Sequence, residues 1–335
     1  MKNLFFLLMV LASFQSFAQS EQTPQETARS FMRTGDFDNA ILVLNRALQN
    51  DKNNFDLQKD LALSFYYKRD YAKALEVVEI MLDRNDADIQ AYQIGGNVYK
   101  ALEEVKEADK MYKKALKKFP KSGALYSEYG ELLWARQDFE AIDFWEKGIK
   151  EDPNYAGNYY NAALFYHKTK DKVWSIVYGE AFVNMESLTE RAAAMKGLLL
   201  ESYKEKLFAD NDLMKDQDKN KSEFAKAYLQ TMAKQSSLVN AGISTEILTA
   251  IRTRFILDWY KTYAAKFPFK LFDYHQQLIR EGMFEAYNQW LFGPVESLPA
   301  YDNWTKTHAE AHAKFTGFQK NRVFKLPVGQ YYQQL

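Results

Sequence analysis

Residues 55–88 read FDLQKDLALSFYYKRDYAKALEVVEIMLDRNDAD, and residues 89–122 read IQAYQIGGNVYKALEEVKEADKMYKKALKKFPKS. Each segment is 34 residues long, and both place small residues at the same two positions. The pattern continues in both directions through the first half of the chain. The small residues are Ala28, Ala62, Gly96, Gly130 and Ala163 at the first position, and Ala40, Ala74, Ala108, Ala141 and Ser175 at the second. A fixed period of about 20 to 50 residues indicates a repeat architecture.

The small residues predict places where two helices approach closely, because the distance between helix axes depends on the side chains at their crossing. Bulky residues recur at positions of their own and would fill the space between successive helix pairs. They are Phe31, Phe65, Tyr99, Leu133 and Tyr166 late in the first helix, and Leu44, Val78, Tyr112 and Trp145 in the second. The pattern therefore predicts antiparallel helix pairs that stack into a continuous core.

The period and the recurrence of small and bulky residues at these positions resemble the tetratricopeptide repeat (TPR) family, and Pro120 and Pro153 close two of the repeats as that family does. The resemblance implies an all-α fold, in which a TPR helical-hairpin superhelix (an α-solenoid) precedes an α-helical C-terminal domain. The expected segments are a signal peptide at 1–18, repeats at about 21–54, 55–88, 89–122, 123–155 and 156–189, and the C-terminal domain at 190–335.

The fifth repeat is degenerate. Lys172, Ser175 and Gly179 stand where an aromatic residue, an alanine and a bulky residue are expected. Such degeneracy is typical of a repeat that caps the array or packs on a different domain. After it, the residues 187–190, Ser-Leu-Thr-Glu, predict a capping box in which the serine caps a new helix. The remaining sequence shows helical periodicity and no alternating strand pattern.

One stretch of the second half repeats a motif of the first. FEAIDFW at 139–145 is matched by FEAYNQW at 284–290. This match suggests that residues 270–292 form a diverged hairpin of the same kind, although His275 occupies the position that should be small.

The first eighteen residues have the pattern of a secretory signal peptide. Lys2 precedes an apolar run from Leu4 to Ala12, and small residues stand three and one before a cleavage site after Ala18. The run is about half of the roughly 20 residues that span a membrane. The alternative to a cleaved signal peptide is a retained N-terminal anchor. No later stretch is long enough to span. We expect a periplasmic or secreted protein.

Composition excludes several classes of site. The chain has no cysteine, which excludes disulfides, thiolate metal sites and a lipoprotein. It has 44 basic and 44 acidic residues, without the basic excess of a nucleic-acid binder. The densest basic cluster is interpreted as a solvated helix face, with a binding patch as the alternative; it comprises Lys113, Lys114, Lys117, Lys118 and Lys121.

Motifs for catalysis and metal binding are incomplete. A calcium loop starting at Asp216 would need Gly and Glu where Lys221 and Ala227 stand. His308 and His312 could share one helix face, but the sequence identifies no third ligand. No nucleophile elbow, phosphate-binding loop or dinucleotide fingerprint is present. We therefore expect no catalytic residue, no cofactor and no metal.

The resemblance implies a site on the concave groove, which the first helices line in TPR proteins. Carried over residue by residue, the groove positions are Lys59, Tyr66, Tyr67, Gln93, Asn97, Lys100, Ser127, Glu131, Trp134, Tyr160, His167 and Lys168. Large aromatic residues at such positions are typical of binding hot spots. The alternative is that Trp134 and Tyr67 are packed by neighbouring elements as core residues.

The expected function is a non-catalytic scaffold or adaptor of the bacterial periplasm that binds a protein or peptide partner in this groove, with no nucleic acid and no membrane-spanning segment. The alternative is an enzyme or a glycan- or ligand-binding protein whose C-terminal domain holds the site, with the repeats as a docking arm. The abundance of aromatic residues, 16% of the chain, suits sugar stacking as well as a core.

Overall fold

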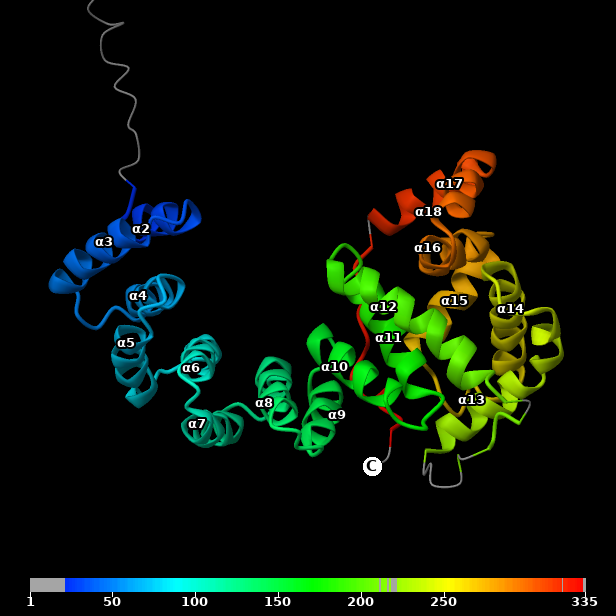
Figure 1. The fold of residues 1–335 in the computed structure, drawn as a ribbon, viewed down its shortest axis with the longest axis horizontal. Helices are drawn as coiled ribbons and strands as arrows, with labels where there is room; N and C mark the ends of the chain where they lie inside the picture. The colour runs from blue at the N-terminus through cyan, green and yellow to red at the C-terminus, as the bar shows by residue number, and fades with distance from the viewer. Residues whose placement is uncertain (1–21, 211, 216, 218–221, 321, 334–335) are drawn as a thin grey trace, which may run out of the picture. The chain divides into compact units, whose positions relative to one another are not determined.

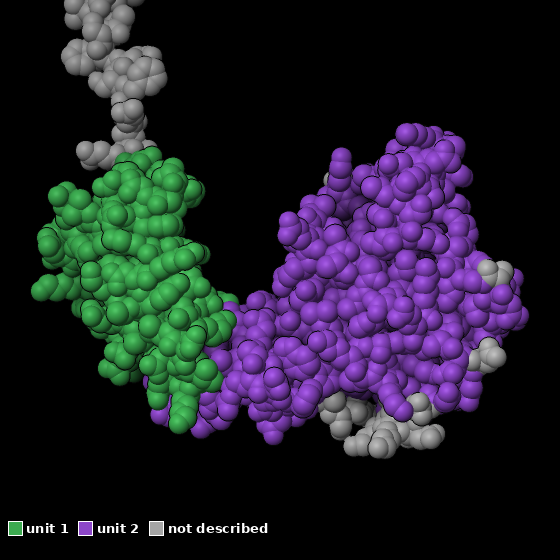
Figure 2. Space-filling model, in the orientation of Figure 1, with its two compact units in different colours: residues 1–108 green, residues 109–335 purple. Residues whose placement is uncertain are grey.

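The computed structural model describes residues 22–210, 212–215, 217, 222–320 and 322–333. The predicted signal peptide lies outside these residues. Within them every regular element is helical and no strand occurs, which confirms the all-α prediction (Figure 1). Two compact units divide the chain, unit 1 with residues 1–108 and unit 2 with residues 109–335 (Figure 2). The boundary expected after residue 189 follows from repeat periodicity and stays a prediction.

Unit 1 consists of helix pairs. They are α2 (Pro24–Arg33) with α3 (Phe37–Asn50), α4 (Phe55–Tyr67) with α5 (Tyr71–Asp83), and α6 (Ile89–Ala101) with the beginning of α7 (Val105–Lys118), a helix that continues into unit 2. Polar side chains cap the helix starts, because the first backbone N–H groups have no partner inside the helix. Thr23 and Glu26 form a capping box at α2, and Asp36 caps α3.

Small side chains lie where the repeat period requires them. All ten residues of the two small positions are buried, and the eight that are not glycine have no exposed surface. In unit 1, Ala28, Ala62 and Ala74 belong to an apolar cluster together with Phe65 and Val78. The register deduced from the sequence is therefore the register of the packed core.

Unit 2 continues with further helices. They are α8 (Gly123–Ala135), α9 (Ala141–Glu151), α10 (Ala156–His167), α11 (Trp174–Met185), α12 (Glu190–Glu201), the π-helix η2 (Ser202–Leu207), α13 (Glu223–Ala233), the 3₁₀-helix η3 (Ser236–Ala241), α14 (Thr245–Thr262), α15 (Lys270–Arg280), α16 (Phe284–Glu296), α17 (Leu298–Thr307) and α18 (Ala309–Lys320). The N-cap of α12 is Thr189, whose hydroxyl accepts from the Ala192 N–H at 3.3 Å. The predicted cap at Ser187 is therefore wrong.

Five hairpin turns share one backbone geometry. In each, an N–H group bonds to the carbonyl five residues earlier, and the residue before the donor has φ between 60° and 78°. The donor and acceptor pairs are Asp36 and Phe31, Asp70 and Phe65, Glu104 and Tyr99, Asp138 and Leu133, and Met283 and Leu278. The α15–α16 hairpin thus has the turn of the repeats. That it is a diverged repeat stays a prediction.

The last described residues, 322–333, contain no helix and cross unit 2 as a C-terminal segment (Figure 1). The backbone of Leu326 exchanges two hydrogen bonds with the Asn154 side chain, at 3.0 and 3.2 Å. The Ser222 hydroxyl donates to the Tyr332 carbonyl at 2.7 Å, and Gln333 donates to the Tyr166 hydroxyl at 2.7 Å. The segment therefore ties the predicted fourth and fifth repeats to the helices that follow them.

Candidate functional site

Lys59, one of the predicted groove residues in unit 1, is buried and ion-paired. Its Nζ lies 2.8 Å from Asp88 and 2.9 Å from Asp56. The neighbouring Asp60 is also buried and accepts from Arg29 of α2 at 2.8 Å. The pairs with Asp88, the N-cap of α6, and with Arg29 of α2 connect one first helix to the next, and the charge of Lys59 is neutralised within the fold.

The predicted tyrosines of unit 1 form a small surface cluster at the end of α4. Tyr67 is 54% exposed and stacks on Phe37 at 5.8 Å between ring centroids. Tyr66 is half-buried and contacts Tyr67 at 5.5 Å and Tyr71 at 5.7 Å. Three further predicted residues are half-buried on α6, namely Gln93, Asn97 and Lys100.

In unit 2, Ser127 and Glu131 belong to a polar ladder between α8 and α10. The Asn161 amide donates to the Glu131 carboxylate at 3.0 Å and to the Ser127 hydroxyl at 3.3 Å, and that hydroxyl donates to Glu131 at 3.3 Å. Ser127 is buried, whereas Glu131 is exposed. Asn161 was not among the predicted site residues.

Trp134 lies half-buried at the centre of an aromatic cluster. Its ring contacts Phe165 at 5.6 Å, Phe139 at 5.9 Å and Trp145 at 6.1 Å, and the Lys168 ammonium stands 5.3 Å from its centroid. Phe139 is 66% exposed, which is unusual for a large apolar ring. We call Trp134, Phe139, Phe165 and Lys168 the Trp134 patch. The structure brings the predicted pair Trp134 and Lys168 together and adds the phenylalanines, which sequence reasoning missed.

The two remaining predicted residues contact the elements after the repeats. The Tyr160 ring packs on Phe182 at 5.0 Å and under the Arg191 guanidinium at 5.1 Å. His167 lies within hydrogen-bond distance of Ser202, at 3.0 Å, and of Glu201, at 3.2 Å. Both side chains are half-buried, so they offer less surface than the Trp134 patch.

A buried charged cluster, which the sequence did not indicate, is centred on Glu180 of α11. Its carboxylate pairs with Arg252 of α14, lies 2.9 Å from His275 Nε2 and accepts from the Tyr287 hydroxyl at 2.6 Å. The Asn288 side chain accepts from Arg252. His275 stands where the hairpin pattern expects a small residue, and at this position it pairs with Glu180.

At pH 7 the Glu180 cluster contains a charged carboxylate and a neutral imidazole. Burial raises the pKa of Glu180, but Arg252 and His275 outweigh burial and lower it to about 2. Burial lowers the pKa of His275 and outweighs the opposing effect of Glu180, so the imidazole is neutral at pH 7. The adjoining cavity has a volume of about 10 Å³, which is room for about one water molecule and no substrate.

A second buried carboxyl, Glu146 of α9, accepts hydrogen bonds from tyrosines. The hydroxyls of Tyr166 and Tyr178 donate to its two oxygens at 2.7 Å each. Burial raises the pKa of Glu146 to about 7, although these bonds and one from Tyr331 oppose the shift. The carboxyl is shared by the predicted fourth and fifth repeats and the C-terminal segment.

A cleft of about 140 Å³ opens between α14, α16 and α17. Tyr301 and Trp304 supply aromatic walls, and Glu246, Glu296 and Gln289 supply polar groups. Such a combination of rings and acceptors suits a small polar ligand. This cleft is the feature of the C-terminal half that best fits the predicted alternative of a ligand site there.

The described residues contain no group of three or more His, Asp or Glu side chains placed to hold a metal ion. His308 stacks on Trp304 at 4.9 Å, and His312 contacts the edge of the same ring at 6.5 Å. The acidic stretch 210–220 lies partly outside the described residues. No helix in the described part of the chain is long and apolar enough to cross a membrane.

Comparisons with known proteins identify the repeats. Two family models, each of the tetratricopeptide repeat, match residues 26–91 and 90–122. Residues 26–122 therefore match tetratricopeptide repeats, as the period predicted. Repeats of this family bind protein or peptide partners, so the fold indicates a protein-interaction scaffold. No curated protein matches the chain.

Two solved structures align with about half of the chain. MamA 41-end from Desulfovibrio magneticus RS-1 is 16% identical with a TM-score of 0.41, over 50% of this chain and 95% of that one. YrrB, described as a TPR protein with an unusual peptide-binding site, is 18% identical with a TM-score of 0.38, over 52% of this chain and 90% of that one.

Proposed function

We propose that the protein is an exported, non-catalytic adaptor that binds a segment of a partner protein on its first helices, with the Trp134 patch as the main anchor. The observation that carries the proposal is the exposure of Phe139, 66%, inside a cluster of fixed aromatic rings. Rings that are already held in place lose little conformational entropy on binding. Interfaces concentrate their energy in such aromatic anchors.

Lys168 gives the patch a polar edge. Its ammonium stands over the Trp134 ring while the side chain remains exposed, so it can pair with an acceptor on the partner without losing contact with the ring. In unit 1, Tyr67 is likewise an exposed aromatic ring. A charged rim group mainly alters association rate, so the rings should contribute most of the affinity.

The proposed localisation is the periplasm or the exterior, and it rests on the signal-peptide pattern of residues 1–18. Amino-terminal sequencing of protein isolated from the native host should begin at or near Gln19. Recovery of an intact Met1 from a soluble cytosolic fraction would overturn the localisation.

The proposal of a non-catalytic role is supported by the size of the cavity beside the Glu180 cluster. A glutamate, an arginine, a histidine and tyrosines together could serve proton transfer, but a substrate needs space that a cavity of about 10 Å³ does not offer. The cluster is better explained as a structural link between helices.

Partner binding can be tested with a photo-crosslinking residue in the native host. The change Phe139→p-benzoylphenylalanine should crosslink a defined partner that the same change at the exposed Leu188 does not. With that partner purified, Trp134→Ala should cost about 2 kcal/mol or more of binding free energy, and Phe139→Ala a measurable part of it. Leu188→Ala is the matched control, because Leu188 is 98% exposed and lies outside the patch.

Two results would contradict the proposal. One is unchanged partner affinity after both Trp134→Ala and Phe139→Ala. The other is a large loss of thermal stability in Trp134→Ala with full partner capture, which would mean that Trp134 is a core residue. Phe139→Ala separates these cases, since its exposed ring contributes little to the core.

A second candidate function is recognition of a glycan in the cleft of Tyr301 and Trp304. Sugars present apolar faces to aromatic rings and hydroxyl groups to carboxylates and amides, and the cleft offers both. Screening the purified protein against soluble glycans tests this candidate. A hit that survives Tyr301→Ala, or no hit at all, would reject it.

A further inference from the structure

The basic cluster found in the sequence borders a groove of about 300 Å³ between α7 and α9, the second helices of the predicted third and fourth repeats. Three lysines form its rim, Lys113 and Lys117 from α7 and Lys147 from α9. The groove shares no residue with the Trp134 patch. The aromatic rings of its floor come from Tyr126, Tyr129 and Phe144.

The floor is held rigidly by its own hydrogen bonds. The Tyr126 hydroxyl donates to the Pro120 carbonyl at 3.0 Å, and the Tyr129 hydroxyl donates to Asp109 at 2.7 Å. Phe144 is half-buried and meets Tyr129 edge to face at 4.5 Å. Because the hydroxyls have partners, what the floor offers a ligand is apolar ring surface, presented mainly by Phe144.

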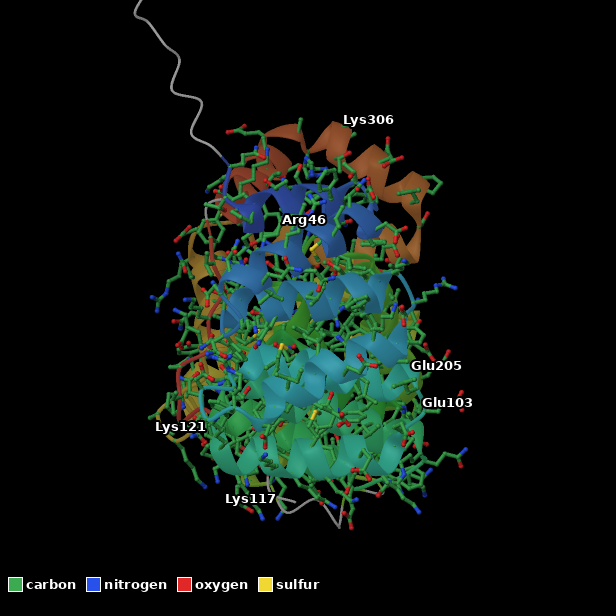
Figure 3. All side chains as sticks on the ribbon, turned by 90° about the vertical axis from the view of Figure 1, so that its left-hand side faces the viewer. Arg46, Glu103, Lys117, Lys121, Glu205 and Lys306 are labelled. Carbon is green, nitrogen blue, oxygen red and sulfur yellow. The ribbon has the colours of Figure 1, made fainter. Side chains whose placement is uncertain are left out.

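Two of the three rim lysines carry positive charge that no ion pair in the described part of the chain neutralises. Lys113 pairs with Asp109 at 2.8 Å. Lys117 and Lys147 form no ion pair with any carboxylate in the described part of the chain, and Lys147 instead stands 5.6 Å from the Tyr126 ring. Figure 3 shows Lys117 and Lys121 at the outer edge of the molecule, so the charge extends past the groove. Asp143 lies four residues before Lys147 on α9 and is exposed.

We propose that this groove binds an acidic segment of a partner protein, with one apolar or aromatic side chain of that segment lying against Phe144. The unpaired lysines match the carboxylates of such a segment, and the apolar floor matches the single apolar side chain. A nucleic acid is disfavoured because the net charge of the chain is zero. This second surface would let the repeats hold one partner on the first helices and another on the second helices.

The test measures fluorescence anisotropy with a labelled nonapeptide that has a central phenylalanine flanked by aspartate and glutamate. The variant Lys113→Gln/Lys117→Gln/Lys147→Gln should weaken binding about tenfold. Its matched control, Lys114→Gln/Lys121→Gln/Lys150→Gln, removes the same charge from exposed lysines of the same region that do not line the groove, and should change affinity less than twofold. Raising the salt concentration should weaken binding in the wild type.

A variant that blocks the groove tests the proposal without changing any charge. Leu116→Trp fills the groove from the half-buried side of α7 and should weaken peptide binding at least as much as the lysine variant. Phe139→Ala should leave it unchanged, which separates this surface from the Trp134 patch. The proposal is overturned if the peptide does not bind, if glutamine in place of its acidic residues preserves binding, if the control lysines matter equally, or if single-stranded DNA binds as tightly.

Discussion

The ion pairs of Lys59 in unit 1 and of Arg252 in unit 2 differ in how far their carboxylates are buried. In unit 1, Lys59 pairs with Asp56 and Asp88, whose side chains are 62% and 43% exposed. In unit 2, Glu180 and Arg252 are 4% and 2% exposed. The carboxylates of Asp56 and Asp88 remain hydrated, whereas the carboxylate of Glu180 has only protein partners. The first kind of pair contributes little to stability, and the second is very sensitive to loss of one partner.

The difference follows from how far apart in sequence the partners are. A repeat contacts its neighbours, so the period alone places its helices, and apolar side chains at fixed positions suffice. The helices after the repeats have no period to place them. They are joined to the predicted fifth repeat by Glu180 of α11, which meets Arg252 across 72 residues and Tyr287 across 107 residues. A buried network whose ion pairs and hydrogen bonds all form in only one arrangement of the helices can specify such long-range packing.

The largest effect expected from this comparison is that of Arg252→Met. It leaves the Glu180 carboxylate buried without its main partner, which should cost about 3–5 kcal/mol of unfolding free energy. Lys59→Met, the corresponding change in unit 1, should cost about 1 kcal/mol or less, because its partners stay hydrated. Urea unfolding monitored by circular dichroism measures both.

A double variant, Glu180→Gln/Arg252→Met, separates the uncompensated charge from the loss of packing. It should be more stable than Arg252→Met alone, since no buried charge is left unpaired. Equal stability of the two single variants Arg252→Met and Lys59→Met would show that the contrast between the units is mistaken.

The second effect concerns pH. The pKa of Glu146 is raised by burial to about 7 from 4.5, so the folded protein retains a proton that the unfolded chain releases above pH 4.5. The contribution of this carboxyl to stability is therefore full below pH 4.5 and is lost as the pH rises to 7, by about 3 kcal/mol in total. Glu146→Gln mimics the protonated form and should lack this loss.

The measurement is the free energy of unfolding of wild type and Glu146→Gln between pH 4.5 and 8. The histidine of the Glu180 cluster acts in the opposite direction, because its lowered pKa destabilises the fold as the pH falls, but it is present in both proteins and cancels in their difference. A difference that does not change with pH would mean that the carboxyl is ionised throughout.

The packing of the repeats could be predicted from the sequence because each small residue has an equivalent in the next repeat. Ala62 and Gly130, for example, are buried where the period places them. For the site, the period placed Trp134 and Lys168 on one surface, and the structure shows their contact. Phe139 was missed because it lies in the turn rather than on a first helix, although a phenylalanine between Asp138 and Glu140 was a visible signal.

The Glu180 cluster could not be predicted from one sequence. Glutamate, arginine and tyrosine are frequent residues, and nothing in their spacing indicates that Glu180, Arg252 and Tyr287 meet. The one local clue was His275, a large polar residue where the hairpin pattern requires a small one. Its partner Glu180 lies 95 positions earlier, a separation that is not a multiple of the repeat length.

The smallest effect tests where the repeat packing ends. Gly197 of α12 lies 34 residues after Ala163, so the register of small residues continues past the predicted array. The close packing around the small residues does not continue to Gly197. A Cβ atom on Gly130 would lie 2.2 Å from Trp145 Nε1, whereas one on Gly197 would meet nothing within 4 Å.

Gly130→Ala should therefore destabilise the protein by about 1–3 kcal/mol, because the Trp145 ring is buried and its Nε1 donates to the Ser127 carbonyl at 3.2 Å. Gly197→Ala should stabilise it by about 0.5–1 kcal/mol, since alanine lowers the entropy cost of the helix and its methyl group has space. Melting temperatures of the two variants should thus move in opposite directions from the wild type. If Gly197→Ala also lowered the melting temperature, α12 would be packed as closely as the first helix of another repeat, and the array would extend beyond residue 189.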